Sequence, residues 1–434
     1  MTGVAVIGLG KMGLPVAAYY AAGGATVVGY DTNRSVAEQV NAGASPIGPE
    51  PGMDEELADL VASGRLRATT DPRDATHAAE VVIVLVPLLA RDGEPDFGAI
   101  DAAVASIAPH VQAGALVIFE TTVPVGTTRT RFAAALRELQ PRSLVAFSPE
   151  RVYSGRIWSD LEQYPKLLGG VDRASSDAAA NFYRRFLPVE VRTLATAEAA
   201  EMVKLAETTY RDINIAFANE LARFADAWNV DVTEVIAAAN SQPYSHIHDP
   251  GIGVGGHCIP HYPHLLEYST SGSELITASR AINEAMPAWV VDRMAAELGG
   301  IGGKTVLLRG VAYRGGVKEA ASSPAFGARD ALEARGAVVL AEDPVFSNDE
   351  LVDLGFEPWK GELVDAVVIV ANHEEYQHID WSGRPRMLVV DGRNCLNPVE
   401  VIAGGHAYLG VGRAGEHRGN MDEASGSRPE IGRR

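Results

Sequence analysis

A glycine-rich segment near the N-terminus, Gly8-Leu9-Gly10-Lys11-Met12-Gly13, is the first feature that could do chemistry. It follows a short apolar run and opens an Ala-rich helical stretch, which is the context in which G-x-G-x-x-G binds a dinucleotide. The glycines would let a pyrophosphate approach the helix N-terminus. Asp31 ends the next apolar run and would accept hydrogen bonds from a ribose diol, so the motif predicts NAD rather than NADP. The alternative is an ordinary tight turn between a strand and a helix.

The second feature is a cysteine in another glycine-rich segment, residues 253–260. Three of the five residues before Cys258 lack side chains, so its thiol would be sterically open. The adjacent His257, when cationic, would favour the thiolate. The alternative is a small buried residue in a loop. The only other cysteine, Cys395, follows the last strand expected in the C-terminal region, and we expect it to be structural.

A dinucleotide site together with a nucleophilic cysteine indicates one particular chemistry. Oxidation of an alcohol gives an aldehyde, which a thiolate captures as a thiohemiacetal. Loss of a second hydride gives a thioester, and water then releases the acid. This sequence of steps consumes two NAD for each molecule of product.

The elements that would position these groups alternate between apolar strands and helices, which predicts parallel sheets covered on both faces. Strands are expected at 4–7, 26–30, 81–86, 116–119, 145–147, 305–308, 338–341, 366–370 and 387–390. Helices are expected at 14–22, 100–108, 197–228, 232–240 and 278–298. The predicted fold class is α/β, with two Rossmann-like doubly wound parallel-sheet domains joined by a central helical region that contains one long helix.

The long helix, residues 197–228, contains no Gly or Pro and would extend for ~48 Å. We expect it to cross between domains or to form a subunit interface. Lys204, Thr208, Arg211 and Asp212 fall at i, i+4, i+7 and i+8 and share one face. That face fits the wall of an anion-binding cleft, and the alternative is the solvent face of an amphipathic helix.

Four segments are therefore expected. Residues 1–192 would form an NAD-binding Rossmann domain, and residues 193–298 a central helical domain with the cysteine loop and a dimer helix. Residues 299–412, which begin with the glycine linker 299–303, would form a second Rossmann-like domain for the nucleotide of a substrate. Residues 413–434 are polar and glycine-rich and are expected to form a disordered tail.

Composition excludes several classes of protein. The 434 residues carry a formal net charge of −19, which argues against nonspecific binding to nucleic acid or to anionic membranes. Two cysteines exclude a disulfide-scaffold secreted protein. The longest apolar run, 81–90, is about half of the ~20 residues that cross a bilayer. The N-terminus has no signal-peptide pattern, so we expect a cytoplasmic protein.

Five motifs, in this order along the chain, resemble the UDP-glucose/GDP-mannose dehydrogenases, which oxidise C6 of a nucleotide sugar to a carboxylate. They are residues 8–13, residues 120–126 (ETTVPVG), residues 148–152 (SPERV) with Gly155, Lys204, and residues 255–258 (GGHC). The resemblance runs from about residue 3 to residue 393. The stretch 210–220 (YRDINIAFANE) is most similar to the branch that acts on UDP-N-acetylhexosamines, particularly UDP-N-acetylmannosamine or UDP-N-acetylglucosamine.

The resemblance implies a role for each matching residue. Cys258 would be the nucleophile, and Lys204 would stabilise the oxyanion. Glu150 would assist proton transfer or thioester hydrolysis, and Thr122 would lie near the nicotinamide. The implied cofactor contacts are Gly8, Gly10, Lys11, Met12, Gly13, Asp31, Pro87 and Thr122. The implied substrate contacts are Arg151, Val152, Lys204, Thr208, Arg211, Tyr244, His246, Gly255, Tyr313 and Arg314. No metal is expected.

Three positions depart from the family pattern. Thr208 replaces the usual asparagine of the oxyanion site, and threonine cannot present an amide NH2 group. Tyr262 replaces an aspartate four residues after the cysteine, and a neutral tyrosine cannot act as a base near pH 7. The neighbouring His261 could do so. Ala321 replaces a substrate-binding arginine. Loss of one oxyanion donor can cost roughly 10²–10³ in rate.

The predicted function is NAD-dependent four-electron oxidation of a nucleotide sugar, most simply a UDP-N-acetylhexosamine, to its uronic acid by a cytoplasmic homodimer. Two alternatives are open. A β-hydroxyacid dehydrogenase would need neither a reactive cysteine nor the second α/β domain. A degenerate protein could bind NAD and a nucleotide sugar with partial or no turnover, which the three departures motivate.

Overall fold

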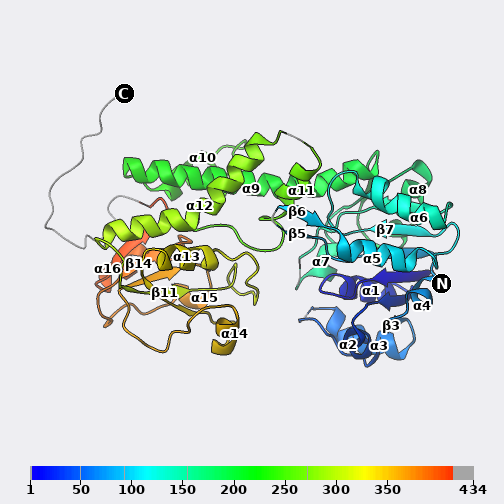
Figure 1. The fold of residues 1–434 in the computed structure, drawn as a ribbon, viewed down its shortest axis with the longest axis horizontal. Coiled ribbons are helices and arrows are strands. Elements are labelled where there is room, and N and C mark those ends of the chain that lie inside the picture. Colours follow the sequence, from blue (N-terminus) through cyan, green and yellow to red (C-terminus); the bar gives the residue numbers. More distant parts are fainter. Residues whose placement is uncertain (1, 49, 92, 154, 271, 414–434) are drawn as a thin grey trace. The chain divides into compact units, whose positions relative to one another are not determined.

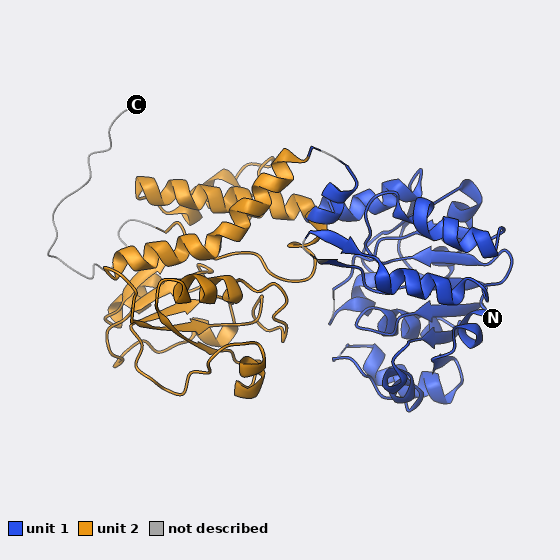
Figure 2. Ribbon diagram, in the orientation of Figure 1, with its two compact units in different colours: residues 1–208, 264–272 blue, residues 209–263, 273–434 orange. Residues whose placement is uncertain are grey.

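The computed structural model describes residues 2–48, 50–91, 93–153, 155–270 and 272–413. The predicted C-terminal tail lies, from residue 414 onward, outside these residues. Two compact units make up the chain (Figure 2). Unit 1 is Met1–Thr208 with His264–Gly272, and unit 2 is Thr209–Pro263 with Ser273–Arg434. Each unit is described below by itself.

Unit 1, which contains the labelled N-terminus (Figure 1), is built on a sheet with the strand order β10-β9-β8-β7-β4-β1-β2-β3. The strands are β1 Gly3–Ile7, β2 Thr26–Tyr30, β3 Leu66–Thr69, β4 Val81–Val84, β7 Leu116–Phe119, β8 Leu144–Phe147, β9 Lys166–Gly170 and β10 Val191–Thr193. From β3 to β8 the order is that of a Rossmann fold, and the pairing is parallel. Strand β9 reverses direction and pairs antiparallel with β8. A short hairpin, β5 Leu89–Arg91 with β6 Glu94–Asp96, lies outside this sheet.

Helices connect these strands, and their apolar residues form one buried core with the sheet. They are α1 Gly13–Ala22, α2 Arg34–Asn41, α3 Met53–Ala62, α4 Pro72–Thr76, α5 Gly98–Ile107, η1 Thr128–Ala133, α6 Ala134–Leu139, α7 Ile157–Leu161 and α8 Arg173–Phe186. Helix α1 is buried along almost its whole length, as its Ala-rich sequence predicts. It contains residues 14–22, where the helix was expected, and begins one residue earlier.

Helix α9 runs from Ala197 to Trp228, the limits that the sequence predicts, and its first twelve residues belong to unit 1. Three further helices follow: α10 Val232–Ala239, α11 Tyr262–Tyr268 and α12 Glu274–Glu297. Helix α12 contains Pro287 and begins four residues before the expected start. The loop between α10 and α11, which carries Cys258, is as long as the Gly/Pro/His-rich sequence indicates.

Unit 2 contains a second parallel sheet with the order β12-β11-β13-β14-β15. Its strands are β11 Thr305–Arg309, β12 Val338–Glu342, β13 Ala366–Ile369, β14 Leu388–Asp391 and β15 Ala407–Gly410. Its helices are α13 Pro324–Glu333, α14 Asn348–Asp353, α15 Glu374–Gln377 and α16 Pro398–Ala403. The order corresponds to 2-1-3-4-5, a doubly wound arrangement whose binding crevice lies where the order reverses, between β11 and β13.

Gly412 and Arg413, on either side of the predicted start of the tail, belong to the fold of unit 2. A Cβ atom on Gly412 would lie 2.6 Å from Ala222, so the chain passes close to helix α9 here. Arg413 Nε lies 3.2 Å from a carboxylate oxygen of Asp231. The prediction that disorder begins at residue 413 was therefore wrong for that residue, because polar composition does not reveal an ion pair with a distant segment.

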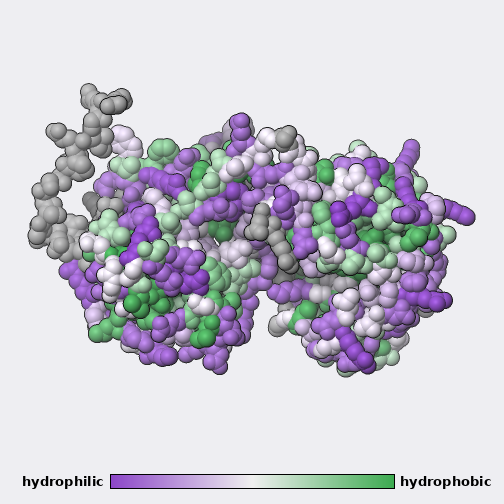
Figure 3. Space-filling view, viewed as in Figure 1, coloured by the Kyte–Doolittle hydropathy of each residue, from purple (hydrophilic) through white to green (hydrophobic). Residues whose placement is uncertain are grey.

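The visible face of each unit is mainly hydrophilic, with hydrophobic residues in smaller groups (Figure 3). Among the described residues, no helix combines the length and the apolar character that crossing a bilayer requires.

Candidate active site

The three glycines after β1 have distinct structural roles. Gly8 has φ of 91°, which favours glycine. A Cβ on Gly13 would lie 1.8 Å from the Gly8 carbonyl oxygen, so helix α1 can approach the strand only because this residue is glycine. A Cβ on Gly10 would meet nothing within 4 Å. No acidic residue occupies the first turn of α1, so the space beside Gly10 meets the positive end of a helix dipole, as a pyrophosphate requires.

Asp31 lies at the carboxyl end of β2, next to this loop. Its two carboxylate oxygens accept hydrogen bonds from the amide groups of Leu9, at 2.9 Å, and Asn33, at 2.8 Å. These bonds fix the carboxylate beside the glycine loop and leave lone pairs for a ribose diol. The predicted neighbours Lys11 and Met12 are exposed and partly exposed. The arrangement fits NAD.

Thr122 follows β7, the strand next to β4, and is buried. Pro87, which follows β4, is exposed at the same carboxyl edge of the sheet. The turn after Thr122 is held by Glu201 of helix α9, whose oxygens accept from the amides of Gly126, at 2.6 Å, and Thr128, at 2.7 Å. Burial raises the pKa of Glu201 to about 7. Sequence reasoning missed Glu201, although its place one turn before Lys204 was a usable signal.

Glu150, three residues after the end of β8, is buried among charged groups. One of its oxygens accepts from the Arg151 amide at 2.7 Å, and the other from Lys166 Nζ at 2.8 Å. Burial opposes ionisation, but Lys166 outweighs it and holds the pKa of Glu150 below its usual value. Lys166 also lies 3.0 Å from Glu120. Glu120 belongs to the motif at residues 120–126 but had no predicted role, and Lys166 was not predicted as a site residue.

Lys204 and Arg151 meet through a carboxylate that sequence reasoning also missed. Arg151 Nε lies 3.1 Å from one oxygen of Glu207, and Lys204 Nζ lies 3.6 Å from the other. The structure thus brings together Glu150, Arg151 and Lys204 within unit 1. Val152, which follows them, packs against the core of this unit.

The polar face of α9 is not a solvent face. Thr208 and Asp212 are fully buried, and Lys204 is 12% exposed. Asp212 accepts hydrogen bonds from Arg280, at 2.7 Å, and from Asn283, so its role is structural. The solvent-face alternative was therefore wrong. Burial raises the pKa of Asp212 despite the adjacent guanidinium.

In unit 2, the loop before Cys258 is fastened to the carboxyl edge of the second sheet. The Ile252 amide donates to the Gly392 carbonyl at 2.8 Å, and Arg393 Nη1 donates to the Gly253 carbonyl at 3.0 Å. The Gly256 amide donates to the Ala321 carbonyl at 2.8 Å. These bonds fix the backbone on the approach to the partly exposed Cys258.

The histidines on either side of Cys258 contact the segment between β11 and α13. His257 Nε2 pairs with Glu319, so the carboxylate partly offsets any positive charge that His257 offers to the thiol. His261 Nε2 lies 2.9 Å from Ser322 Oγ. Ser322 has φ of 47°, a left-handed conformation that is uncommon outside glycine. Ala321, which departs from the family pattern, precedes Ser322 and accepts the Gly256 amide, so this segment supports the cysteine loop.

Tyr313 forms one wall beside the glycines that precede the cysteine. A Cβ on Gly255 would lie 2.7 Å from Tyr313 Cβ, and one on Gly256 would lie 3.2 Å from its ring. The Arg314 guanidinium lies 5.7 Å from the centre of the same ring and is exposed. Both residues follow β11, at the point where the strand order reverses. Here the structure places together Gly255, Tyr313 and Arg314.

Helix α9 also holds the start of the cysteine loop through two amide side chains. Asn214 donates to the His246 carbonyl at 2.7 Å, and Asn219 accepts from the Gly251 amide at 2.9 Å. Tyr244, by contrast, is 93% exposed. Its contact with substrate stays a prediction. Arg211 is partly buried.

Cys395 differs from Cys258 in its surroundings. Its Sγ atom donates to Asp391 at 3.7 Å. Burial, together with that carboxylate, raises the pKa of Cys395 to about 12. The thiolate is therefore disfavoured, as the structural role predicted for Cys395 requires.

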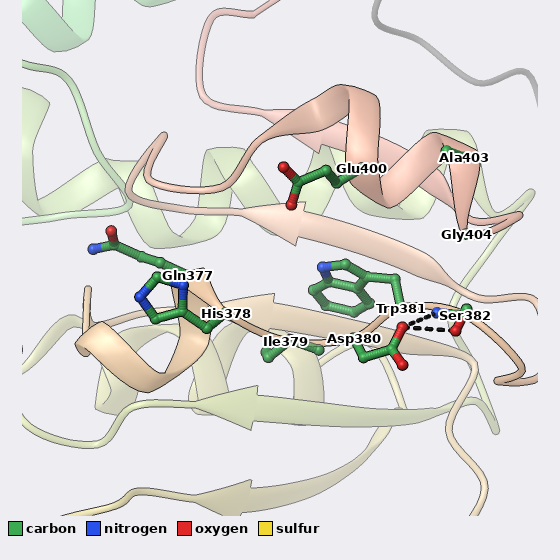
Figure 4. Close-up of a pocket in the computed structure, with 9 residues that line it drawn as sticks. All are labelled: Gln377, His378, Ile379, Asp380, Trp381, Ser382, Glu400, Ala403 and Gly404. Carbon is green, nitrogen blue, oxygen red and sulfur yellow. Dashed lines mark hydrogen bonds between the residues drawn. The ribbon is translucent and has the colours of Figure 1, made fainter.

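A cavity of about 520 Å³ lies elsewhere in unit 2, between residues 377–382 and helix α16 (Figure 4). Trp381 and Ser382 precede β14, and Gly404 precedes β15, so the cavity reaches the amino ends of these strands. Ligands of doubly wound folds bind at the carboxyl ends. This cavity does not contain the predicted site residues. No cluster of His, Cys, Asp and Glu suited to a metal is found in the described residues.

Comparison with known proteins gives three consecutive family matches. Residues 2–187 match the NAD binding domain of the UDP-glucose/GDP-mannose dehydrogenase family, residues 198–285 match its central domain, and residues 307–398 match its UDP binding domain.

Full-length relatives support the same assignment. The UDP-N-acetyl-D-mannosamine dehydrogenase of Pyrococcus horikoshii is 35% identical over 426 residues, which cover 94% of this chain and 99% of the relative. Its solved structure gives a TM-score of 0.85, with 34% identity, and covers 95% of this chain and 99% of that one. The NDP-N-acetyl-D-galactosaminuronic acid dehydrogenase of Ralstonia solanacearum is 33% identical and covers 92% of this chain and 97% of the relative.

Proposed function

This chain belongs to the UDP-glucose/GDP-mannose dehydrogenase family, and from that premise we propose its reaction and substrate. As an NAD-dependent nucleotide-sugar dehydrogenase it acts on a CH–OH group. The proposed substrate is a UDP-N-acetylhexosamine, whose C6 hydroxyl is oxidised through four electrons to the carboxylate of a uronic acid. Relatives named for N-acetyl-D-mannosamine and N-acetyl-D-galactosaminuronic acid substrates support this choice of sugar.

The observation that carries the proposal is the difference between the two cysteines. Cys258 is partly exposed on a loop whose backbone is fixed by the bonds of Ile252, Gly253 and Gly256. Cys395 donates to a carboxylate and has a raised pKa. A nucleophile must be accessible and ionisable, so the chemistry assigns covalent capture to Cys258.

In the proposed reaction the C6 alcohol loses a proton and a hydride to give an aldehyde. The Cys258 thiolate adds to the aldehyde carbon, and the resulting thiohemiacetal loses a second proton and hydride to become a thioester. Water attacks the thioester, releasing the carboxylic acid and the free thiol. NAD, when bound at the glycine loop, supplies the acceptor for each hydride, so two NADH form for each sugar oxidised.

Other residues support these steps. Lys204 would stabilise negative charge on the reacting oxygen, since a cation aimed at developing charge lowers the barrier. Glu150 would hold or activate the water that releases the acid. Thr122 is proposed to lie near the nicotinamide. Arg151, whose guanidinium contacts Glu207, would bind substrate.

The nucleotide is assigned to the second α/β domain, residues 299–412, and NAD to residues 1–192, with the central residues 193–298 carrying Cys258. The match of residues 307–398 to a UDP binding domain supports a uridine nucleotide. Tyr313 and Arg314, at the crevice between β11 and β13, are the proposed contacts, together with Gly255, His246, Tyr244, Val152, Thr208 and Arg211. No nucleic acid or membrane partner is proposed.

We propose a homodimer through helix α9. Tyr210, Phe217, Phe224 and Trp228 occur at i, i+7, i+14 and i+18, which places them on one face. All four are exposed, Trp228 to 76%. A contiguous aromatic stripe of this kind marks a protein interface.

A reducing compartment, the cytoplasm, is proposed because Cys258 must stay a thiol.

The two alternatives make different predictions. A β-hydroxyacid dehydrogenase lacks a second α/β domain, so the sheet β11–β15 argues against it. The departures at Thr208, Tyr262 and Ala321 are the reason to consider a degenerate binding protein.

The test is a steady-state assay with UDP-, GDP- and dTDP-sugars. Two NADH per UDP-N-acetylhexosamine supports the proposal, whereas one NADH, or none with any sugar, would contradict it.

A further inference from the structure

Lys166 is a buried cation that the proposed mechanism does not use. Its side chain is 5% exposed, and its Nζ atom lies 2.8 Å from Glu150 and 3.0 Å from Glu120. Both carboxylates are themselves almost fully buried. Burying a lysine is costly unless it is paired, so two close carboxylates at this depth are a specific arrangement.

The reversed strand β9 explains how the lysine reaches Glu150. Strands β8 and β9 pair antiparallel, with Phe147 opposite Gly169. Continued for three residues beyond Phe147, this register places Glu150 opposite Lys166. The other strand pairs of the eight-stranded sheet are parallel. The antiparallel pair of this sheet therefore places a cation beside Glu150, the third residue after β8.

Glu120 completes the cluster from the end of the neighbouring strand β7. It accepts a 2.6 Å hydrogen bond from the Tyr183 hydroxyl, while its second oxygen is buried and has no hydrogen-bond partner. Burial raises the pKa of Glu120, whereas the pKa of Glu150 is lowered by Lys166 against the effect of burial. One cation facing two carboxylates therefore leaves Glu150 ionised and makes Glu120 the member that more readily holds a proton.

We propose that Lys166 is a positioning residue that fixes the Glu150 carboxylate, ionised and in one orientation, for the release of the acid. Glu120 competes with Glu150 for the same cation and so tunes that effect. The inference rests on the proposed function, because it assumes that Glu150 acts on the water that attacks the thioester. The ionisable groups that bear on Glu150 are Lys166, Glu120, Lys204 and Tyr20, and Tyr183 bonds to Glu120.

The test uses the full-length enzyme with NAD and the UDP-sugar that it turns over. Rapid-quench kinetics measures the first NADH separately from acid release, and intact mass measures acylated Cys258. For Lys166→Met we expect the first NADH to form at nearly the wild-type rate. We expect acid release to slow about tenfold or more, with acyl-enzyme accumulating. The acidic limb of its pH profile should move up by about one unit, because Glu150 loses its cation.

Three matched variants separate positioning from general damage. Lys166→Arg should restore the position of the acidic limb. Glu120→Gln, which removes the competing carboxylate, should move that limb the opposite way, to lower pH. Lys304→Met removes a partly exposed lysine 3.9 Å from Asp365 in unit 2 and should change neither step.

The inference is overturned if Lys166→Met slows both steps equally. It is also overturned if the acidic limbs of the pH profiles of Lys166→Met and Glu120→Gln do not move in opposite directions. If Lys166→Met does not fold, Glu120→Gln alone decides by the direction of its shift. If Glu150→Gln releases acid at the wild-type rate, the role of Glu150 in the proposed function fails, and this inference fails with it. If Glu150→Gln is slow and the Lys166 variants are normal, only this inference fails.

Discussion

Thr208 Oγ1 donates a 3.1 Å hydrogen bond to the carbonyl oxygen of Lys204, one turn earlier in helix α9. Threonine has a single hydroxyl proton, so the donor that would replace an asparagine amide is already used inside the helix. The helix carries Lys204 as the remaining cation of the proposed oxyanion site.

The first prediction follows from this bond and from Tyr262. Lys204 still supplies positive charge, so the first oxidation should survive both departures. Thioester hydrolysis should be more strongly affected by the two departures. This step needs a water that is held and activated, and position 262 has no aspartate to do so. We therefore expect a covalent adduct on Cys258 to accumulate during turnover, visible as a burst of acylated protein by rapid quench and intact mass.

The paired variant Thr208→Asn with Tyr262→Asp should accelerate the hydrolytic step and change the first hydride transfer little. Each single variant serves as its control. If no adduct appears in the wild type, and the double variant is no faster or is slower, then Thr208 and Tyr262 are adapted to this substrate and the interpretation of them as deficits is mistaken.

The second prediction compares the two cysteines. Cys258→Ser should abolish complete oxidation to the acid, since a hydroxyl is a far weaker nucleophile at neutral pH. Cys395→Ser should leave turnover nearly intact, because burial and Asp391 already disfavour the thiolate there. The measurement is the yield of uronic acid and of NADH per sugar. Similar effects of the two substitutions would show that the roles are wrongly assigned.

The sequence predicted the parts of the fold that have strong periodicity. Helix α9 has the predicted limits because its 32-residue stretch contains no Gly or Pro that would end a helix. Strands β1 and β4 are apolar and almost wholly buried, as central parallel strands must be. The edge strand β10 was missed, since its sequence, Val-Arg-Thr, is too short and too polar to show a pattern.

In the candidate site, motifs indicated single residues but not their partners. Lys166 begins a strand whose direction cannot be predicted from composition, so its place opposite Glu150 became visible only through the antiparallel register. Glu207 and Glu201 lie on helix α9, where acidic residues are common, and only the tertiary structure shows that they contact Arg151 and the turn at Gly126. Long-range charge pairing of this kind leaves no periodic signal.

The third prediction concerns the cofactor. Asp31 is fixed by amide bonds from Leu9 and Asn33, so it cannot swing away from a 2′-phosphate without losing them. We expect kcat/KM to favour NAD over NADP by about 100-fold or more, through lost hydrogen bonds and charge repulsion. Asp31→Asn should reduce this preference while leaving the melting temperature nearly unchanged. Equal kcat/KM values for the two cofactors in the wild type would contradict the assignment.

The fourth prediction concerns the aromatic stripe of α9. Phe217→Glu with Phe224→Glu should convert a dimer to monomers in sedimentation velocity, because two charges would be buried without partners in the interface. The control is Val352→Glu, which changes an exposed apolar residue on α14. A wild-type monomer, or a double variant that stays dimeric, would show that the stripe serves another purpose.

The last prediction concerns Glu201, whose carboxylate joins α9 to the turn that follows Thr122. Its pKa in the folded state is raised to about 7 by burial, above the ordinary value of 4.5. The folded protein therefore binds this proton more tightly than the unfolded chain does between these two values. The stability that the protonated Glu201 carboxyl contributes is fully present below its pKa in the unfolded chain. It is lost as the pH rises through the folded-state pKa of about 7. Glutamine at position 201 does not titrate.

We expect Glu201→Gln to melt close to the wild type at pH 5 and at a higher temperature than the wild type at pH 8. The difference should grow across the window between pH 4.5 and about 7 and level off above it, because ionising the buried acid costs about 3 kcal/mol. Asp226→Asn, at a partly exposed acid in unit 2 paired with Arg293, is the matched control and should show no such gain. If Glu201→Gln instead melts lower at pH 8, then the two amide bonds from Gly126 and Thr128 outweigh burial, and the carboxylate is ionised throughout this range.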